Sequence, residues 1–239
     1  MSDSLHSSSP SMESWYSADR PVVLPALLLC DFGHLDDEVK RLEAAGAKAM
    51  HLDVMDGLFV PQLTYGLVIV EAVRRAATVP IEVHMMVERP DDTAIQYAKA
   101  GADIVTVHIE GLAKTKETLS AIEAQGSQAH LAISPDTPVS QVEPFLSSCS
   151  GVLVMSVEPG FGGQAFQPSA IDKIQKLQEI RASTGHDFCI GVDGGISTKT
   201  IASVAKAGAD LIVAGSAILR QADYAEALRE LEALAQKSK

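Results

Sequence analysis

Short apolar runs alternate with amphipathic stretches along the chain from Val22 onward. Eight of these runs have the length of strands and are rich in Val, Ile and Leu. They cover residues 22–29, 48–55, 80–87, 103–110, 129–133, 151–157, 188–193 and 210–215. Continuous apolar runs of about four to eight residues are typical of parallel strands that are buried on both faces.

The stretches between the runs have the spacing of helices. In residues 34–45 and 66–77, apolar side chains recur about every three to four residues and fall on one side. Three of the joints that lead from a helix into a strand contain a glycine between alanines, at Gly46, Gly101 and Gly208. Glycine at these joints can adopt the left-handed conformation that ends a helix. The chain therefore repeats one strand-helix unit.

Eight such units predict an α/β protein with a closed (β/α)8 TIM barrel. The alternative is an open, doubly wound sheet, which usually has fewer strands and a glycine-rich phosphate turn after its first strand. Here that turn, residues 28–33, reads Leu-Leu-Cys-Asp-Phe-Gly and matches poorly. Residues 1–20 are rich in serine and lack periodicity, so we expect a flexible N-terminal tail before a single barrel domain over residues 21–239.

Composition narrows the class of protein. The chain has 239 residues, 46% of them hydrophobic, which is enough for one large core. Its 31 acidic residues outnumber the 19 basic ones, and the net charge of −12 is spread along the chain, which argues against nucleic acid as a partner. The three cysteines form no disulfide framework or zinc pattern, and no apolar run could cross a membrane. We expect a soluble protein of the reducing cytoplasm.

Polar side chains stand out at the carboxyl ends of three predicted strands, where barrel active sites are built. Because side chains alternate along a strand, His51 and Asp53 share one face of the second strand. His84 lies on the corresponding face of the third strand and Asp193 on that of the seventh. A single histidine of this kind is more often structural than metal-binding. The combination of three strands favours a site where all four side chains meet.

Two buried carboxylates would repel each other unless a cation lay between them. Two neutral histidines and two carboxylates supply four nitrogen and oxygen ligands and neutralise a divalent charge. This set is compatible with one ion of Zn, Fe(II), Mn or Co and does not choose among them.

Glycines gather after the sixth, seventh and eighth predicted strands. Such segments let backbone N–H groups approach an anion closely, and phosphate sites in barrels commonly form after the last strands. One glycine-rich loop could be only a tight turn, but three together favour a shared phosphate pocket. The segments contain Gly160, Phe161, Gly162, Gly163, Gly194, Gly195, Gly215 and Ser216.

Several methionines and polar residues near the strand ends give weaker evidence of function. Met55, Met86 and Met155 share the inward registers, where methionine is by default a core residue. His108 and Glu110 could be a supporting pair or a substrate contact, and we assign them no catalytic role. No lysine lies at a predicted strand end, which argues against a Schiff-base mechanism.

Five motifs in order along residues 23–219 resemble the ribulose-phosphate 3-epimerase family. They are His51 to Gly57, Val83 to Val87, Val157 to Gln164, Val192 to Ile196 and Gly215 to Ile218. The resemblance implies that His51, Asp53, His84 and Asp193 bind the metal, that Asp53 and Asp193 are the acid/base pair, and that the three methionines surround the intermediate. It also implies that the glycine segments, with His84, bind the substrate, and that the protein forms homo-oligomers.

The family resemblance predicts an enzyme that interconverts D-ribulose 5-phosphate and D-xylulose 5-phosphate at C3 through a metal-stabilised 2,3-enediolate. Two departures leave alternatives open. The family usually has serine where this chain has Ala26, and asparagine where it has Gln62. The alternatives are a 3-epimerase of a six-carbon ketose phosphate such as allulose 6-phosphate, and a sugar-phosphate-binding barrel without activity.

Overall fold

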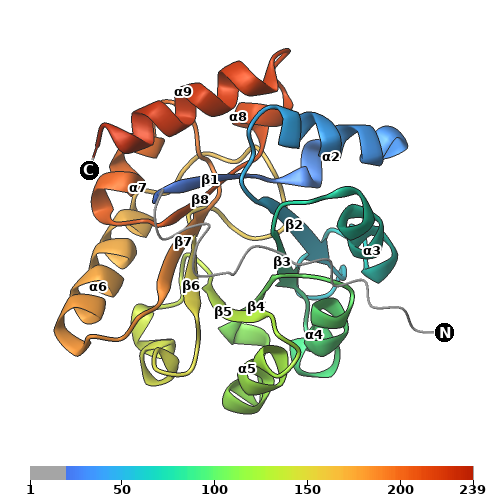
Figure 1. Ribbon diagram of the computed structural model, residues 1–239. Coiled ribbons are helices and arrows are strands. Elements are labelled where there is room, and N and C mark those ends of the chain that lie inside the picture. Colours follow the sequence, from blue (N-terminus) through green and yellow to red (C-terminus); the bar gives the residue numbers. More distant parts are fainter. Residues whose placement is uncertain (1–19, 239) are drawn as a thin grey trace.

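The computed structural model describes residues 20–238, and within them eight parallel strands form a ring (Figure 1). Seven neighbouring pairs are hydrogen-bonded in one sheet, and a parallel bridge between Ala26 and His51 joins its two edges. The predicted (β/α)8 barrel is confirmed. Its strands are β1 (Val22–Pro25), β2 (Met50–Met55), β3 (Ile81–Met86), β4 (Ile104–His108), β5 (Gln128–Ile133), β6 (Gly151–Met155), β7 (Cys189–Asp193) and β8 (Leu211–Ala214).

Helices surround the ring of strands in Figure 1. Both helices expected from periodicity are present, each shorter by one residue at either end than predicted. The helices are α2 (Leu35–Ala44), α3 (Leu67–Ala76), α4 (Pro90–Lys99), α5 (Thr115–Glu123), α6 (Ser169–Thr184), α7 (Ile201–Ala207), α8 (Ser216–Leu219) and α9 (Tyr224–Gln236). Between β5 and β6 the described chain has only short 3-10 turns, η4 (Val139–Gln141) and η5 (Glu143–Phe145).

The first predicted strand is too long. We expected it to cover residues 22–29, but β1 ends at Pro25 and residues Leu27–Leu29 form the 3-10 turn η1. The apolar character of this segment has a different origin, since Leu28 and Leu29 line the pocket at the carboxyl end of the barrel. The strand and the pocket wall are both apolar, so the composition of residues 22–29 does not show where the strand ends.

Alternation along the strands divides the apolar residues into two cores. One core fills the space between strands and helices and includes Met50, Leu52 and Val54 of β2. A smaller core lies inside the ring and includes Leu24 and Leu153. The polar residues of β2 and β3 share the interior face with the smaller core, because side chains two positions apart point the same way.

The glycines at the three predicted joints have the expected conformation. Gly46, Gly101 and Gly208 have φ angles of +101°, +102° and +109°, which favour glycine because it lacks a Cβ. Each of the three lies just after the end of a helix, α2, α4 or α7. These joints return the chain from the outer layer to the next strand.

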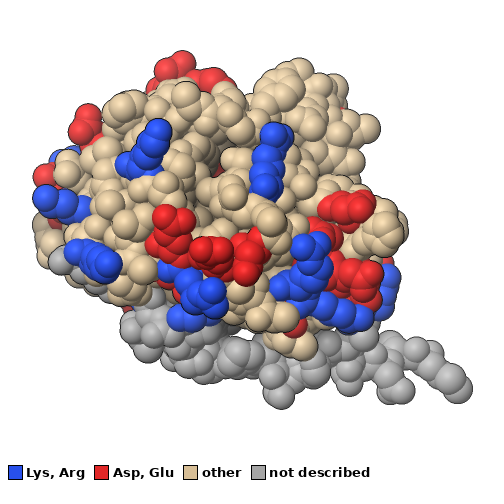
Figure 2. All heavy atoms as spheres, turned by 90° about the horizontal axis from the view of Figure 1, so that it is seen from above, with Lys and Arg blue, Asp and Glu red and all other residues tan. Residues whose placement is uncertain are grey.

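The remaining sequence expectations concern the ends and the surface. Apart from Arg20, the predicted tail of residues 1–20 lies outside the described residues. Cys30, Cys149 and Cys189 are free thiols. Among residues 20–238, no helix combines the length and apolar character that a membrane crossing requires. On the side seen in Figure 2, basic and acidic side chains are interspersed.

Candidate active site and metal centre

The four predicted ligands meet at the carboxyl end of the barrel. His51 Nε2 lies 3.2 Å from Asp53 Oδ1 and 3.8 Å from Asp193 Oδ2. His84 Nδ1 lies 3.4 Å and 3.6 Å from the same two oxygens. One ligand atom from each residue lies within 4.8 Å of all the others. The strand register explains the approach, because Asp53 of β2 pairs with His84 of β3.

The environment of this cluster favours the charged form of Asp53. Burial opposes ionisation of Asp53, but the adjacent His51 and His84 outweigh burial and lower the pKa of Asp53. For His51, burial favours the neutral ring, yet Asp53 and Glu82 raise its pKa well above the usual range. Burial also opposes the charge on Glu82, and His51 nevertheless lowers the pKa of Glu82 to about 2. The site therefore attracts positive charge.

A hydrogen-bonded support holds His51. Its Nδ1 lies 2.8 Å from Glu82 Oε2, on the opposite side of the ring from the carboxylates of the cluster. Glu82 in turn accepts a hydrogen bond from the hydroxyl of Thr106 at 2.6 Å. A carboxylate that accepts from one ring nitrogen leaves the other nitrogen free to bind a metal. Sequence analysis did not assign this role to Glu82, although its register beside His51 could have indicated it.

The chemistry of the cluster fits a divalent cation. His84 Nδ1 is buried, lacks a hydrogen-bond partner among the described residues, and faces the two aspartates. A buried nitrogen in this position costs free energy unless something binds it. Two imidazole nitrogens and two carboxylate oxygens suit a transition-metal ion or zinc. The predicted ligand set is therefore brought together as a candidate metal centre, with the identity of the ion open.

The loop after β2 supplies side-chain hydrogen bonds to the backbone of that strand. The hydroxyl of Thr64 donates to Asp53 O at 2.7 Å and accepts from Met55 N at 3.0 Å. Tyr65 Oη accepts from Asp53 N at 3.0 Å. These two hydroxyls take the place of strand hydrogen bonds and fix the backbone that carries Asp53.

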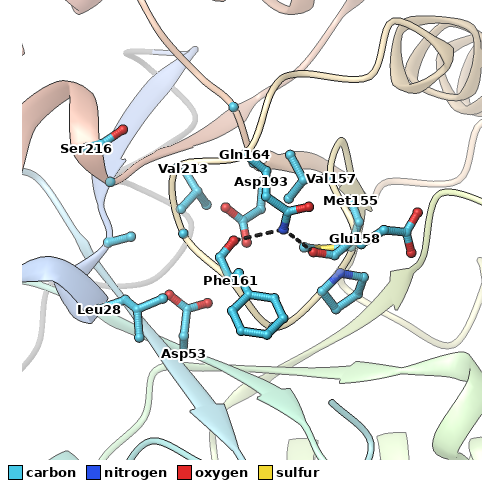
Figure 3. Close-up of a pocket in the computed structure, with 18 of the residues that line it drawn as sticks. Leu28, Asp53, Met155, Val157, Glu158, Phe161, Gln164, Asp193, Val213 and Ser216 are labelled. Carbon is cyan, nitrogen blue, oxygen red and sulfur yellow. Dashed lines mark hydrogen bonds between the residues drawn. The ribbon is translucent and has the colours of Figure 1, made fainter. Parts of the chain in front are cut away.

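One pocket opens above the cluster, and Figure 3 shows the carboxylates of Asp53 and Asp193 within it. His51 and His84 are fully buried and lie outside its lining. Every other predicted site residue lines the pocket. These are Met55, Met86, Met155, Gly160, Phe161, Gly162, Gly163, Gly194, Gly195, Gly215 and Ser216.

The loops after β6, β7 and β8 form one side of the pocket, the glycine side, and their backbone is constrained. Gly194 and Gly195 have φ angles of +112° and +62°. A Cβ on Gly194 would lie 2.4 Å from Val157 Cγ2, and one on Gly195 would lie 2.5 Å from Phe166 N. Only glycine fits these positions without movement of a neighbour. The backbone can therefore come closer to a bound group here than a side chain would allow.

Two side chains that sequence analysis did not assign hold the glycine side in shape. Gln164 Nε2 donates to Glu158 O at 2.6 Å and to Phe161 O at 2.9 Å, as the dashed lines in Figure 3 show. The hydroxyl of Ser156, at the end of β6, lies within hydrogen-bond distance of Asp193 O and Gly194 O. Ser156 thereby ties the loop after β7 to the loop after β6.

The sequence analysis gave His130 no role. It lies in β5 and is buried inside the barrel. Its ring fills the space above Gly151, where an added Cβ would lie 2.6 Å from His130 Cε1. Burial lowers the pKa of His130 to about 4. The predicted strand at residues 129–133 already included this histidine.

Comparisons with known proteins agree with this geometry. The model of the ribulose-phosphate 3 epimerase family matches residues 22–219. The ribulose-phosphate 3-epimerase of Bacillus subtilis is 43% identical over 210 residues, which are 87% of this chain and 97% of that protein. The enzyme of Escherichia coli is 39% identical over 211 residues, covering 88% and 94% of the two chains.

Solved structures share the fold at lower identity. The crystal structure of KGPDC from Streptococcus mutans has a TM-score of 0.71 at 18% identity and covers 91% of this chain and 98% of that one. A 3-hexulose-6-phosphate synthase has a TM-score of 0.66 at 21% identity, covering 89% and 99%. These likenesses support the barrel, while the family match and the two close relatives show that the chain belongs to the ribulose-phosphate 3-epimerase family of enzymes acting on carbohydrates.

Proposed function

We propose that the protein is a metal-dependent epimerase that interconverts D-ribulose 5-phosphate and D-xylulose 5-phosphate by inversion at C3. Family membership supports the reaction, and the names of the relatives indicate a ribulose phosphate as substrate. Inversion at C3 of that sugar gives the xylulose phosphate. The single observation that carries the mechanism is that two carboxylates, Asp53 and Asp193, face one pocket beside two histidines. An epimerase that acts through proton transfer needs a base on one face of the carbon and an acid on the other.

In this mechanism the two aspartates act on opposite faces of C3. One carboxylate removes the C3 proton, because the resulting carbanion is delocalised into the C2 carbonyl as a 2,3-enediolate. The other aspartate begins protonated and delivers its proton to the opposite face. Each general acid/base step contributes roughly 10² to 10⁴ in rate. In the reverse direction, Asp53 and Asp193 exchange roles.

The four side chains of the cluster would hold the metal ion. Each aspartate has two oxygens, so that one can bind the cation while the other carries the reacting proton. When bound, a divalent ion of Zn, Fe(II), Mn or Co supplies Lewis-acid stabilisation, worth several kcal/mol, to charge that develops on substrate oxygen. His51 and His84 lie outside the pocket lining, which leaves both proton-transfer positions to the aspartates.

The glycine side would bind the phosphate group. Backbone N–H groups in glycine-rich segments bind an anion without a basic side chain, which suits a pocket that contains Asp53, Asp193 and Glu158. Met55, Met86 and Met155 line the pocket and would exclude water from the delocalised anion. The phosphate thereby anchors one end of the sugar and places C3 between the aspartates.

Deuterium wash-in at C3 from heavy water tests reaction, substrate and metal together. We expect ribulose 5-phosphate to exchange its C3 hydrogen, a chelator to abolish the exchange, and added divalent ion to restore it. Exchange that survives complete metal removal would contradict metal dependence. Failure to exchange on any ketose phosphate would favour a binding protein without activity.

The six-carbon alternative requires a separate comparison. Ala26 lines the pocket without a hydroxyl to offer the sugar, which leaves room for a different substrate. Measurement of kcat/KM for ribulose 5-phosphate and allulose 6-phosphate distinguishes the two. A higher value for the six-carbon sugar would replace the proposed substrate and leave the two-aspartate chemistry intact.

A further inference from the structure

A chain of hydrogen bonds leads from the buried His84 away from the pocket. His84 Nε2 and His108 Nε2 are 2.9 Å apart, and both side chains are fully buried. The two rings are nearly parallel, with centroids 5.1 Å apart. On the far side, His108 Nδ1 lies 3.0 Å from Glu110 Oε2. The proposed function gives His84 a role but none to His108 or Glu110.

Glu110 is held in one orientation by the loop after β5. Its Oε1 accepts from Ser134 N at 2.8 Å and from the hydroxyl of Thr137. Lys173 Nζ fixes that loop by donating to the carbonyl oxygens of Ser134, Pro135 and Thr137. Because Oε1 already has two donors, Oε2 is the oxygen that remains for the histidine.

The direction of every proton in this chain of hydrogen bonds follows from Glu110. A carboxylate only accepts, so His108 Nδ1 must carry a hydrogen. In the neutral ring, His108 Nε2 then has the lone pair and accepts from His84 Nε2. His84 consequently has its hydrogen on Nε2 and its lone pair on Nδ1, the nitrogen that lacks a partner among the described residues and faces Asp53 and Asp193.

We propose that Glu110 and His108 are positioning residues that fix the tautomer of His84, so that its Nδ1 lone pair is directed at the metal centre. The inference rests on the proposed function, because it assumes that a cation binds there. It also gives the two histidine ligands a common design. His51 is oriented directly by Glu82, whereas His84 is oriented by a carboxylate one ring further away.

Glu110→Gln is the sharpest variant because it is nearly isosteric and reverses the chain of hydrogen bonds. Its amide oxygen replaces Oε1 toward the donors of Ser134 and Thr137, so that its NH2 group faces His108 Nδ1. That nitrogen must then accept, His108 Nε2 becomes the donor, and the hydrogen of His84 moves to Nδ1. We expect Co(II) affinity, measured by competition with a chelator, to fall roughly 10- to 100-fold.

Two His108 variants separate tautomer control from packing. His108→Phe keeps a ring beside His84 but removes the acceptor, and we expect a similar loss of Co(II) affinity. His108→Gln can present an oxygen near the position of Nε2, and we expect it to recover most of that loss. Ser127→Ala removes a buried hydrogen bond to Ala102 O, outside this chain of hydrogen bonds, and serves as the control with unchanged Co(II) affinity.

Ring-nitrogen NMR of 15N-histidine-labelled metal-free protein gives a second readout. We expect the His84 signals to change from the Nε2–H to the Nδ1–H tautomer in Glu110→Gln. Co(II) affinity within about two-fold of the wild type in both Glu110→Gln and His108→Phe would overturn this inference alone. A wild-type protein that binds no Co(II) would overturn the metal centre and this inference together, so the two failures can be told apart.

Discussion

The two sides of the pocket are built in different ways. On the histidine side, defined by β2, β3 and β4, the functional groups are side chains that alternate along strands, with His51, Asp53 and His84 held by buried hydrogen bonds. On the glycine side, defined by the loops after β6, β7 and β8, the wall consists mainly of backbone. Asp193, the last residue of β7, is the side chain that joins the two.

The difference follows from what each side has to bind. A metal ion and a proton require groups with a definite charge and lone-pair direction, which only side chains supply. A phosphate group can be bound by N–H groups, provided that the backbone comes close enough. The histidine side therefore depends on which residues are present, and the glycine side depends on the absence of a Cβ.

Replacement of Asp193, which lies between the two sides of the pocket, should have the largest effect on the rate. We expect Asp193→Asn to lower kcat by roughly 10² to 10⁴, because the amide is neither a general base nor an equivalent metal ligand. Circular dichroism should show a folded barrel, since Asp193 lies at the end of its strand. Asp53→Asn should behave alike, and near-normal turnover in either variant would contradict the two-aspartate mechanism.

A methyl group on the glycine side should weaken binding more than chemistry. In Gly194→Ala the new Cβ would collide with Val157 Cγ2, so the loop must move. We expect KM for the sugar phosphate to rise about 10- to 100-fold, with a smaller change in kcat. Steady-state kinetics separate the two parameters.

Gly126→Ala is the matched control for that variant. Gly126 lies outside the pocket lining and also has a positive φ angle, +89°, but its Cβ would meet no atom of the described residues within 4 Å. The substitution should cost about 1 kcal/mol of stability through backbone strain with little change in KM. An equal rise in KM for both variants would mean that backbone strain, and not the close approach at Gly194, weakens binding.

The support behind Asp53 should have an intermediate effect. Thr64→Val removes the hydroxyl that bonds Asp53 O and Met55 N but keeps the shape of the side chain. We expect kcat to fall about ten-fold, because small displacements of a catalytic group reduce the rate. Thr64→Ser retains the hydroxyl and should restore activity. An inactive Thr64→Ser enzyme would assign the effect to packing.

Substitution of His130, which is buried inside the barrel, should have the smallest effect on catalysis. Burial lowers its pKa to about 4 from the ordinary value of 6.5. The unfolded state therefore binds a proton first, and the folded state loses stability as the pH falls from 6.5 to about 4. The loss should reach about 3 kcal/mol. Unfolding by denaturant at several pH values measures it.

His130→Leu isolates this contribution. The substitution should flatten the dependence of unfolding free energy on pH in that window while leaving kcat near the wild-type value. An unchanged slope would show that other groups cause the acid sensitivity of the histidine side.

Much of the site could be predicted because its signals are local. The alternation of His51 and Asp53 on one strand, and the glycines after the last strands, are visible within a few residues. The partners that orient these groups were harder to identify. Glu82, Thr64, Gln164 and the role of His108 each depend on a contact with a residue from another segment, whose position the register and loops decide.

The sequence by itself determined the repeating strand-helix units, the barrel, and the four ligand types, because periodicity and residue chemistry act over short distances. Only the tertiary structure decided how closely the four predicted ligands meet, and that the apolar run after β1 turns into a pocket wall. It also decided which nitrogen of His84 faces the carboxylates. The hydrogen bonds that reach His84 and His51 come from residues 24 and 31 positions away in the chain, and no local pattern encodes their approach.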